Sequence, residues 1–200
     1  MHVPMNGPGE RHELLALVGM PGSGKSTIGR QLARRIGWDF RDSDGVIETR
    51  IDGSIRSFFE REGEDRFREI ESAVIGELSG LDRAVLATGG GAVLRVDNRR
   101  VLRERCHVVY LRCSPDELYR RLRTDTQRPL LQVGDPRSRL RELFTQRDPL
   151  YRETAHLIVD SGRATVPTQV NTLLMQLELA GIVMRRPDAA PTDEARNERR

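Results

Sequence analysis

The residues best suited to chemistry are those of Gly19–Ser26, which read GMPGSGKS and match the pattern G-x-x-x-x-G-K-S in full. Glycines let the backbone curl so that successive N–H groups point inward at a phosphate, and the N-terminal end of a following helix adds positive potential. Lys25 would reach the β- and γ-phosphates, and the Ser26 hydroxyl would ligate Mg²⁺. The pattern predicts an ATP site whose candidate contacts are Gly22, Ser23, Gly24, Lys25, Ser26 and Thr27.

The scarcity of lysine supports this prediction. Lysine and arginine together number 33, and Lys25 is the only lysine. Codon bias explains the excess of arginine most simply, yet the chain keeps a compact ammonium where it differs chemically from a planar guanidinium. The alternative is a glycine-rich turn with an accidental lysine. A GTP-dependent switch is excluded, because its guanine-reading motif N-K-x-D needs a second lysine.

The phosphate loop indicates a nucleotide but leaves the reaction open, because P-loop proteins include switches, motors and kinases. Further candidate residues lie in DSD at 42–44, GEDRFREIE at 63–71, TGGGA at 88–92, TQRPLL at 126–131 and QRDPLY at 146–151. In 42–44, carboxylates that alternate at the end of a strand would point to opposite sides, one to a metal and one to an acceptor. In 88–92, three glycines at a carboxyl strand end would let a ligand approach the backbone.

Taken singly, each segment has a plainer interpretation, such as a turn or helix N-cap for DSD, a solvated charged helix for 63–71, or a flexible loop for the glycines. Taken together and in this order, residues 14 to about 175 resemble the bacterial shikimate kinases, compact members of the nucleoside-monophosphate-kinase-like P-loop group. The resemblance implies transfer of the γ-phosphoryl group of ATP to the 3-hydroxyl of shikimate, with Mg²⁺ as cofactor, in chorismate and aromatic amino acid biosynthesis.

The resemblance also implies roles for residues on the acceptor side. Asp44 would hydrogen-bond the acceptor hydroxyls and act as the base. Arg68 would grip the acceptor carboxylate with its planar fork, held in place by Glu71 at i+3, and Arg147 would be the second carboxylate contact. The remaining substrate contacts would be the backbone of Gly90 and Gly91 and the rings of Phe59 and Phe67, although a plain core role is an equal alternative for both rings.

On the phosphate side, the resemblance implies that Asp42 supports Mg²⁺ together with Ser26. Arg128 would stand at the start of a lid at about 123–138 and meet the phosphates when the lid closes, so it joins Lys25 and Asp44 as a catalytic candidate. Closure of such a lid excludes water, which would otherwise accept the phosphoryl group. Arg121, on the preceding helix, is a further candidate for contact with the nucleotide.

Two departures from the family pattern leave alternatives open. Arg41 precedes DSD where many members have an apolar residue, and SGRAT at 161–165 lacks the expected Asn-Pro, which leaves the adenine contacts undefined. A related small-molecule kinase, such as a gluconate kinase, shares the P-loop and the lid, but the paired acceptor arginines and TGGG favour shikimate. A non-catalytic, nucleic-acid-associated P-loop protein is the more distant alternative.

The elements that must position these residues alternate between strand and helix. Apolar, β-branched runs predict strands at 13–18, 84–87, 107–111 and 157–160. Apolar residues at helical spacing predict helices at 26–36 and 167–180. This alternation favours an α/β fold of the three-layer P-loop type, with a central parallel sheet flanked by helices and a mobile lid.

Composition limits the remaining possibilities. Residues 1–12 and 183–200 lack apolar periodicity and predict disordered tails around a single kinase domain at 13–182. The net charge of +3 comes from 33 basic and 30 acidic residues that are interspersed, which disfavours a nucleic-acid partner. No apolar run could span a bilayer, and Cys106 and Cys113 are expected to be core thiols. We therefore expect a cytoplasmic monomer, away from membranes, whose partners are ATP and a small acceptor.

Overall fold

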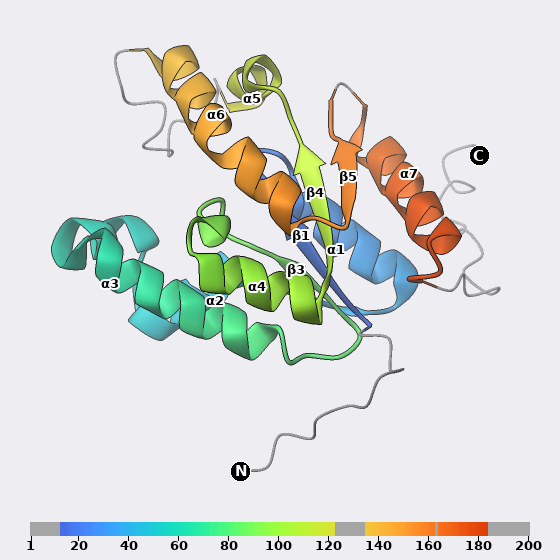
Figure 1. Cartoon of the computed structure of the whole chain (residues 1–200), viewed down its shortest axis with the longest axis horizontal. Helices are drawn as coiled ribbons and strands as arrows, with labels where there is room; N and C mark the ends of the chain where they lie inside the picture. Colours follow the sequence, from blue (N-terminus) through green and yellow to red (C-terminus); the bar gives the residue numbers. More distant parts are fainter. Residues whose placement is uncertain (1–12, 123–134, 163, 184–200) are drawn as a thin grey trace, which may run out of the picture.

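The computed structural model describes residues 13–122, 135–162 and 164–183, and its centre is a sheet of five parallel strands (Figure 1). The order across the sheet is β2-β3-β1-β4-β5. The strands are β1 (Leu14–Val18), β2 (Asp39–Asp42), β3 (Ala84–Ala87), β4 (His107–Arg112) and β5 (Leu157–Asp160). Each strand predicted by range is present to within one residue at its ends, and the predicted α/β P-loop fold is confirmed.

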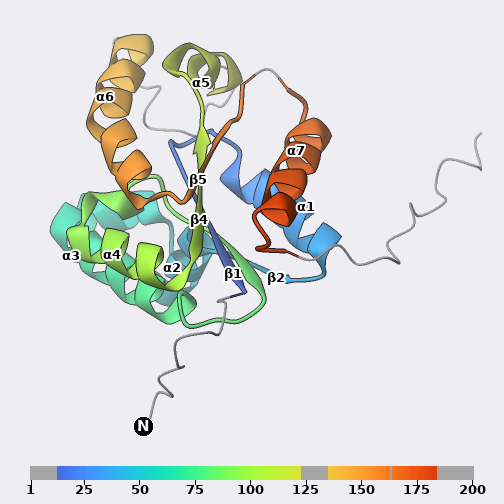
Figure 2. The ribbon, with the colours of Figure 1, turned by 45° about the vertical axis from the view of Figure 1, so that its right-hand side comes forward.

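Helices cover both faces of this sheet. They are α1 (Lys25–Ile36), α2 (Ser43–Ile51), α3 (Ile55–Leu78), the short 3₁₀-helix η1 (Ala92–Leu94), α4 (Val96–Arg105), α5 (Pro115–Leu122), α6 (Pro136–Thr154) and α7 (Val166–Leu179). Figure 2 shows α1 and α7 on one side of the sheet and α2, α3, α4 and α6 on the other. The two predicted helices correspond to α1 and α7, shifted by one residue.

The two layers of helices follow from the period of two in β1. Leu14, Ala16 and Val18 belong to the hydrophobic cluster under α3, α4 and α6, whereas Leu15 and Leu17 belong to the cluster under α1 and α7. All five residues are at most 1% exposed. Successive side chains of a strand point to opposite faces, so a continuous apolar run is what a strand needs when both faces are covered.

Helix α3 is broken near its middle. Gly63 has φ 82° and ψ 174°, which is not helical, and the chain resumes a helical path beyond it. These angles lie in a region that is essentially accessible to glycine alone. Phe59 precedes the break and Phe67 follows it, so the break decides how these two aromatic residues face each other.

The parallel strands bring their carboxyl ends to one edge of the sheet. Asp42 at the end of β2 pairs with Ala87 at the end of β3, and Ala87 also pairs with Leu17 of β1. The loop after β1, the DSD segment after β2 and the TGGG segment after β3 are therefore neighbours. This is the edge at which open parallel α/β sheets bind ligands.

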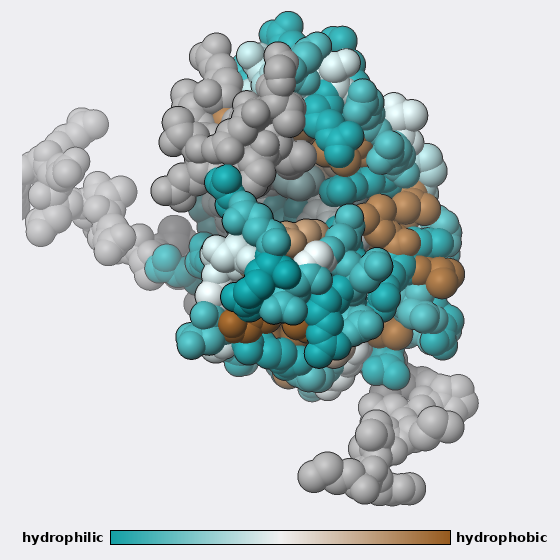
Figure 3. Space-filling model, turned by 90° about the vertical axis from the view of Figure 1, so that its left-hand side faces the viewer, coloured by the Kyte–Doolittle hydropathy of each residue, from teal (hydrophilic) through white to brown (hydrophobic). Residues whose placement is uncertain are grey.

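The face of the molecule near α3 is largely polar. Figure 3 shows that hydrophobic residues on the face near α3 lie in separate small groups among hydrophilic ones. Cys106 and Cys113 are buried free thiols, as predicted. Within the described ranges, no helix is both long enough and apolar enough to cross a membrane.

Candidate functional site

The turn between β1 and α1 has the geometry of a phosphate cradle. Gly22 and Gly24 have φ of 83° and 97°, values that glycine adopts without strain. Lys25 is 8% exposed, and its Nζ donates to the carbonyl oxygens of Gly19 at 2.8 Å and Met20 at 3.0 Å. The ammonium thus lies across the loop, where a phosphate held by the loop amides would meet it.

Two oxygen ligands meet at the start of α1. The Ser26 hydroxyl donates to Asp42 Oδ2 at 2.6 Å, and Asp42 Oδ1 accepts from the Asp44 N–H at 3.1 Å as the N-cap of α2. Mg²⁺ prefers such oxygen ligands, with substrate phosphates and waters completing its octahedron. Among the described residues, no group of three or more His, Cys, Asp or Glu could hold a metal. The Ser26 hydroxyl and the Asp42 carboxylate are oxygen groups of the kind that Mg²⁺ takes when substrate phosphates supply further ligands.

Asp44 lies in the first turn of α2, so the expected alternation of two strand carboxylates is wrong. The reason is that Asp42 caps the helix, and the chain turns helical directly after it. Asp44 instead approaches residues 88–91 (TGGG, called the glycine segment below), because a Cβ added at Gly89 would lie 2.6 Å from Asp44 Oδ1. Burial raises the pKa of Asp44 to about 6, with a further contribution from Asp42 and an opposing one from Lys25. A carboxylate that titrates near neutral pH is suited to exchange a proton with a ligand.

Arg68 is fixed by two carboxylates of its own helix. It donates from Nη1 to Glu71 at 2.6 Å and from Nη2 and Nε to Glu64 at 2.9 and 3.1 Å. Glu71 is 1% exposed, and burial raises its pKa while Arg68 pulls it down. A Cβ added at Gly91 would overlap the Arg68 guanidinium. The contact suggested by the i+3 spacing is therefore present, and the guanidinium lies against the glycine segment.

The two predicted pocket residues Phe59 and Phe67 form one aromatic surface beside Arg68. Their ring centroids are 4.4 Å apart, and the Arg68 Cζ lies 5.9 and 5.2 Å from them. Phe67 is buried at 3% exposure, and Phe59 packs against the same core from a less buried position. The two interpretations offered by the sequence are thus compatible, since both rings belong to the core and also flank the guanidinium.

The glycine segment is fastened to its neighbours. Thr88 donates from both its N–H and its hydroxyl to the Leu17 carbonyl, each at 3.1 Å, and the Gly89 N–H donates to the buried Ser43 hydroxyl at 2.9 Å. A Cβ at Gly90 would meet the Pro21 ring at 2.7 Å. The segment therefore approaches the phosphate loop so closely that position 90 has no room for a side chain.

Helix α6 reaches the same segment. Arg147 Nη1 donates to the Gly90 carbonyl at 3.2 Å, and Tyr151 Oη donates to the same oxygen at 2.5 Å. Tyr151 is fully buried and stacks on Tyr110 with ring centroids 4.9 Å apart. Arg147 was predicted to be a substrate contact and Tyr151 was not, although both stand in QRDPLY, four residues apart and hence on one face of the helix.

Four further residues were predicted to contact the nucleotide: Arg121, Ser23, Thr27 and Arg128. Arg121 of α5 donates to the carbonyls of Ser23 at 3.3 Å, Gly162 at 2.5 Å and Ser161, so it joins the phosphate loop to the segment after β5. Ser23 is buried and Thr27 is exposed on α1. Arg128 and most of the lid expected at about 123–138 lie outside the described residues.

The predicted residues therefore form two adjoining groups. Lys25, Ser26 and Asp42 surround the phosphate loop, while Arg68, Arg147 and the glycine segment lie beside it. Asp44 stands between the two groups. It lies close enough to Lys25 on one side and to Glu71 on the other for both charges to affect its pKa.

Comparison with known proteins agrees with this arrangement. The family model described as shikimate kinase matches residues 21–178. A shikimate kinase of Paracidovorax citrulli is 59% identical over 169 residues, which cover 83% of this chain and 92% of the relative. One from Ralstonia nicotianae is 51% identical over 177 residues, covering 88% and 93%.

Solved structures show the same similarity. A shikimate kinase from Acinetobacter baumannii in complex with shikimate matches with a TM-score of 0.79 and 42% identity, over 84% of this chain and 93% of that one. A sugar kinase from Janibacter sp. HTCC2649, at 18% identity and a TM-score of 0.56, shares the fold. Because the family model and these relatives span most of its length, the chain belongs to the shikimate kinase family and is a kinase.

Proposed function

We propose that this chain transfers the γ-phosphoryl group of ATP to the 3-hydroxyl of shikimate, giving shikimate 3-phosphate and ADP, as a step of chorismate and aromatic amino acid biosynthesis. The observation that carries the proposal is the position of Asp44. Its carboxylate lies between the phosphate loop and the glycine segment beside Arg68. It is close enough to Lys25 of the loop for the ammonium to lower its pKa. A base in this position can face a hydroxyl next to a terminal phosphate.

The acceptor carboxylate would be bound by Arg68 and Arg147. Glu64 accepts from Nε and Nη2 of Arg68, and Glu71 accepts from Nη1. A planar guanidinium held in this way needs little reorganisation to bind a carboxylate. The backbone of Gly90 and Gly91 and the ring surface of Phe59 and Phe67 would complete the pocket. This arrangement supports an anionic acceptor over the neutral end of a sugar.

The base role of Asp44 follows from its environment. With a pKa raised to about 6 by burial, the carboxylate is ionised at neutral pH yet basic enough to accept a proton. It would orient the acceptor hydroxyl in line with the phosphorus and take its proton as the oxygen–phosphorus bond forms. In-line positioning supplies most of the catalysis in phosphoryl transfer.

The ATP phosphates would lie in the loop that precedes α1. Lys25 would exchange its contacts with the Gly19 and Met20 carbonyls for phosphate oxygens, and Ser26 with Asp42 would hold Mg²⁺. Bound Mg²⁺ neutralises charge on the β- and γ-phosphate oxygens. Arg121 would steady the loop from the nucleotide side, and Arg128 would reach the phosphates from the lid.

We further propose that the protein works in the cytoplasm as a monomer, with a single kinase domain over residues 13–182 and no nucleic-acid or membrane partner. The 33 basic and 30 acidic residues are interspersed along the chain, which supports the proposal that no nucleic acid is bound. A gluconate-type kinase is the rival closest in mechanism. Gluconate also carries a carboxylate, so the two arginines suit either acceptor, and the match to the shikimate kinase family over residues 21–178 is what favours shikimate.

The test is ADP release in a coupled assay with ATP and Mg²⁺. We expect turnover with shikimate and only background release with gluconate, quinate or no acceptor. Turnover with gluconate in place of shikimate would overturn the acceptor and keep the kinase, whereas equal release without any acceptor would overturn both.

A further inference from the structure

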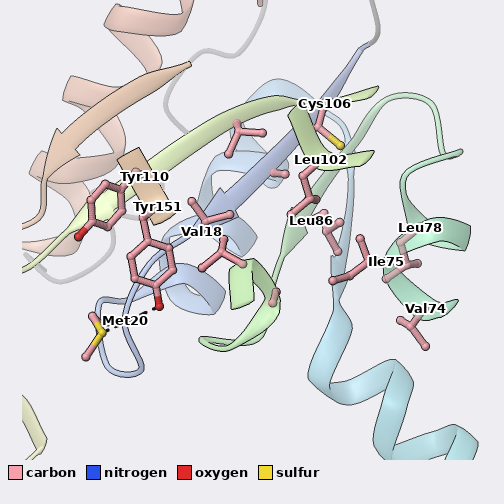
Figure 4. Packing of buried hydrophobic residues seen from close by; sticks show 14 of the residues in the cluster. Val18, Met20, Val74, Ile75, Leu78, Leu86, Leu102, Cys106, Tyr110 and Tyr151 are labelled. Carbon is pink, nitrogen blue, oxygen red and sulfur yellow. Dashed lines mark hydrogen bonds between the residues drawn. The ribbon is translucent and has the colours of Figure 1, made fainter. Parts of the chain in front are cut away.

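A buried phenol contacts the glycine segment beside the acceptor residues, and no role has been assigned to it. Tyr151 is 0% exposed, and its hydroxyl donates to the Gly90 carbonyl at 2.5 Å and lies 3.9 Å from the Met20 sulfur. Figure 4 shows Tyr151 beside Tyr110, with its hydroxyl directed to Met20 in the phosphate loop. Burial raises the pKa of Tyr151 to about 12, so the phenol is a hydrogen-bond donor over the whole working range of pH.

The carbonyl that Tyr151 holds belongs to a tight turn. The Ala92 N–H donates to the Gly89 carbonyl at 3.1 Å, which makes Gly90 and Gly91 the two central residues. Gly91 has φ −97° and ψ −2°, close to the values of a type I turn at this position. The Gly90 carbonyl therefore belongs to the central peptide of the turn.

A type I turn and a type II turn differ by a flip of this central peptide. Type II needs a positive φ at the second central residue, which disfavours most residue types but not glycine. With Gly91 in that position, the local sequence does not select either orientation. Contacts from outside the turn must make the choice, and those from α6 are the hydrogen bonds of Tyr151 and Arg147 to the Gly90 oxygen.

The orientation matters because a trans peptide is planar, and its N–H points opposite to its carbonyl. When the Gly90 oxygen is held toward α6, the Gly91 N–H points away from α6, and a flip would replace this donor by an oxygen. The same oxygen also receives the Arg147 guanidinium, whose Nε is buried without a hydrogen-bond partner among the described residues. The orientation of the Gly90 carbonyl thus affects two donors, the Gly91 N–H and the Arg147 guanidinium.

We propose that Tyr151 is a positioning residue for the acceptor: its hydroxyl holds the Gly90–Gly91 peptide in the type I orientation, and the Gly90 carbonyl in turn orients Arg147. The inference rests on the proposed function, because it assumes that the acceptor lies against this turn. Tyr151 itself touches the backbone of the turn and not the reacting atoms.

The experiment compares Tyr151→Phe with Tyr110→Phe. Both changes remove one phenol oxygen, and Tyr110 is a matched control because its hydroxyl donates to Asp148 at 2.8 Å instead of to the turn. For Tyr151→Phe we expect the KM and the Kd for shikimate to rise about tenfold, the usual order for one buried hydrogen bond. The KM for ATP should stay within about twofold, because Tyr151 is proposed to position the acceptor alone. A general loss of folded structure would instead raise the KM for both substrates. Tyr110→Phe should lower the melting temperature without this split.

An NMR measurement tests the turn without reference to turnover. In Tyr151→Phe the Gly91 amide should show exchange between two orientations, by line broadening or a second peak, whereas the wild type and Tyr110→Phe should show one. An unchanged shikimate KM, or a loss shared equally by both substrates with a single Gly91 signal, would overturn the inference. If the wild type itself does not phosphorylate shikimate, the proposed function fails, and the Gly91 signal still decides whether Tyr151 holds the turn.

Discussion

At the scale of single residues, Asp44 has to satisfy two opposed requirements. Catalysis needs an ionised carboxylate, while burial and the neighbouring carboxylate of Asp42 favour the protonated form. A group whose pKa is higher in the folded than in the unfolded protein binds protons more readily when folded. The ionised side chain therefore lowers the free energy of unfolding at neutral pH, and this loss is recovered as the pH falls from about 6 toward 3.8.

The substitution Asp44→Asn separates the two requirements. At pH 7.5 we expect the variant to be more stable than the wild type by an amount on the order of 2 kcal/mol, because it no longer buries a carboxylate whose pKa is raised to about 6. Turnover should fall by at least about a hundredfold, the usual contribution of a positioned base. Urea unfolding at pH 7.5 and pH 4.5 provides the measurement, and the gain in stability should shrink at the lower pH.

Two results would contradict the roles proposed for Asp44. A variant that is less stable than the wild type at pH 7.5 would mean that ionised Asp44 is a net stabilising group. A variant that keeps near-normal turnover would mean that Asp44 is not the base.

At the scale of elements, the break in α3 brings together residues that a straight helix would separate. Phe59 and Phe67 are eight residues apart, a rise of about 12 Å along a regular helix, yet their ring centroids lie 4.4 Å apart. The non-helical angles of Gly63 make this possible. The aromatic surface beside Arg68 therefore depends on one backbone conformation.

Replacing Gly63 by Ala tests this dependence. A Cβ at Gly63 would meet nothing within 4 Å, so the expected cost of about 1–3 kcal/mol is conformational. We expect a lower free energy of unfolding and a raised shikimate KM, because the rings no longer hold Arg68, with little change in the KM for ATP. Gly76→Ala is the matched control: Gly76 lies in the same helix, also has open space around its Cβ, and should gain up to about 1 kcal/mol. If both variants behave alike, the break has no special role.

Only some of the helices and strands could be predicted from the sequence. Four of the five strands and the first and last helices were predictable because apolar runs and helical periodicity are local patterns. Strand β2 has the sequence DFRD and no apolar run, so its range was not predicted. The break at Gly63 was not, since an isolated glycine in a charged segment has no distinctive periodicity. The position of Asp44 was also mispredicted, because the side chain of Asp42 ends the strand by capping the next helix. Tyr151 was missed for another reason: its partner, Gly90, is distant in the sequence, and no local pattern links them.

At the scale of the whole molecule, stability depends on pH through groups at opposite ends of the sheet. His156, just before β5, accepts a hydrogen bond at Nδ1 from the Val108 N–H at 3.0 Å. Burial lowers the pKa of His156, and Arg103 and His107 act in the same direction. The neutral ring is the stabilising form, so its contribution is complete above the ordinary value of 6.5 and is lost as the pH falls through the lowered pKa. Asp44 has the opposite sign in a similar range of pH.

Because the two trends oppose each other, variants are more informative than the wild-type curve. His156→Asn places an amide oxygen near the position of Nδ1 and removes the titration, whereas His156→Leu removes the acceptor. We expect the asparagine variant to lose less stability than the wild type between pH 7 and pH 5 in thermal unfolding, and the leucine variant to be less stable throughout. Parallel curves for the wild type and His156→Asn would show that the ring does not control this range.

The contacts of Lys25 also determine how the protein can be labelled. Its ε-amine is the only one in the chain, and it lies against the Gly19 and Met20 carbonyls within the phosphate loop. A reagent that acylates lysine therefore has a single side chain to modify, and every lysine adduct is an adduct in the phosphate loop. Mass spectrometry of that adduct, with and without nucleotide, becomes a footprint of loop occupancy that needs no engineered label. In this arginine-rich protein, the residue proposed to hold the phosphates is also its built-in reporter.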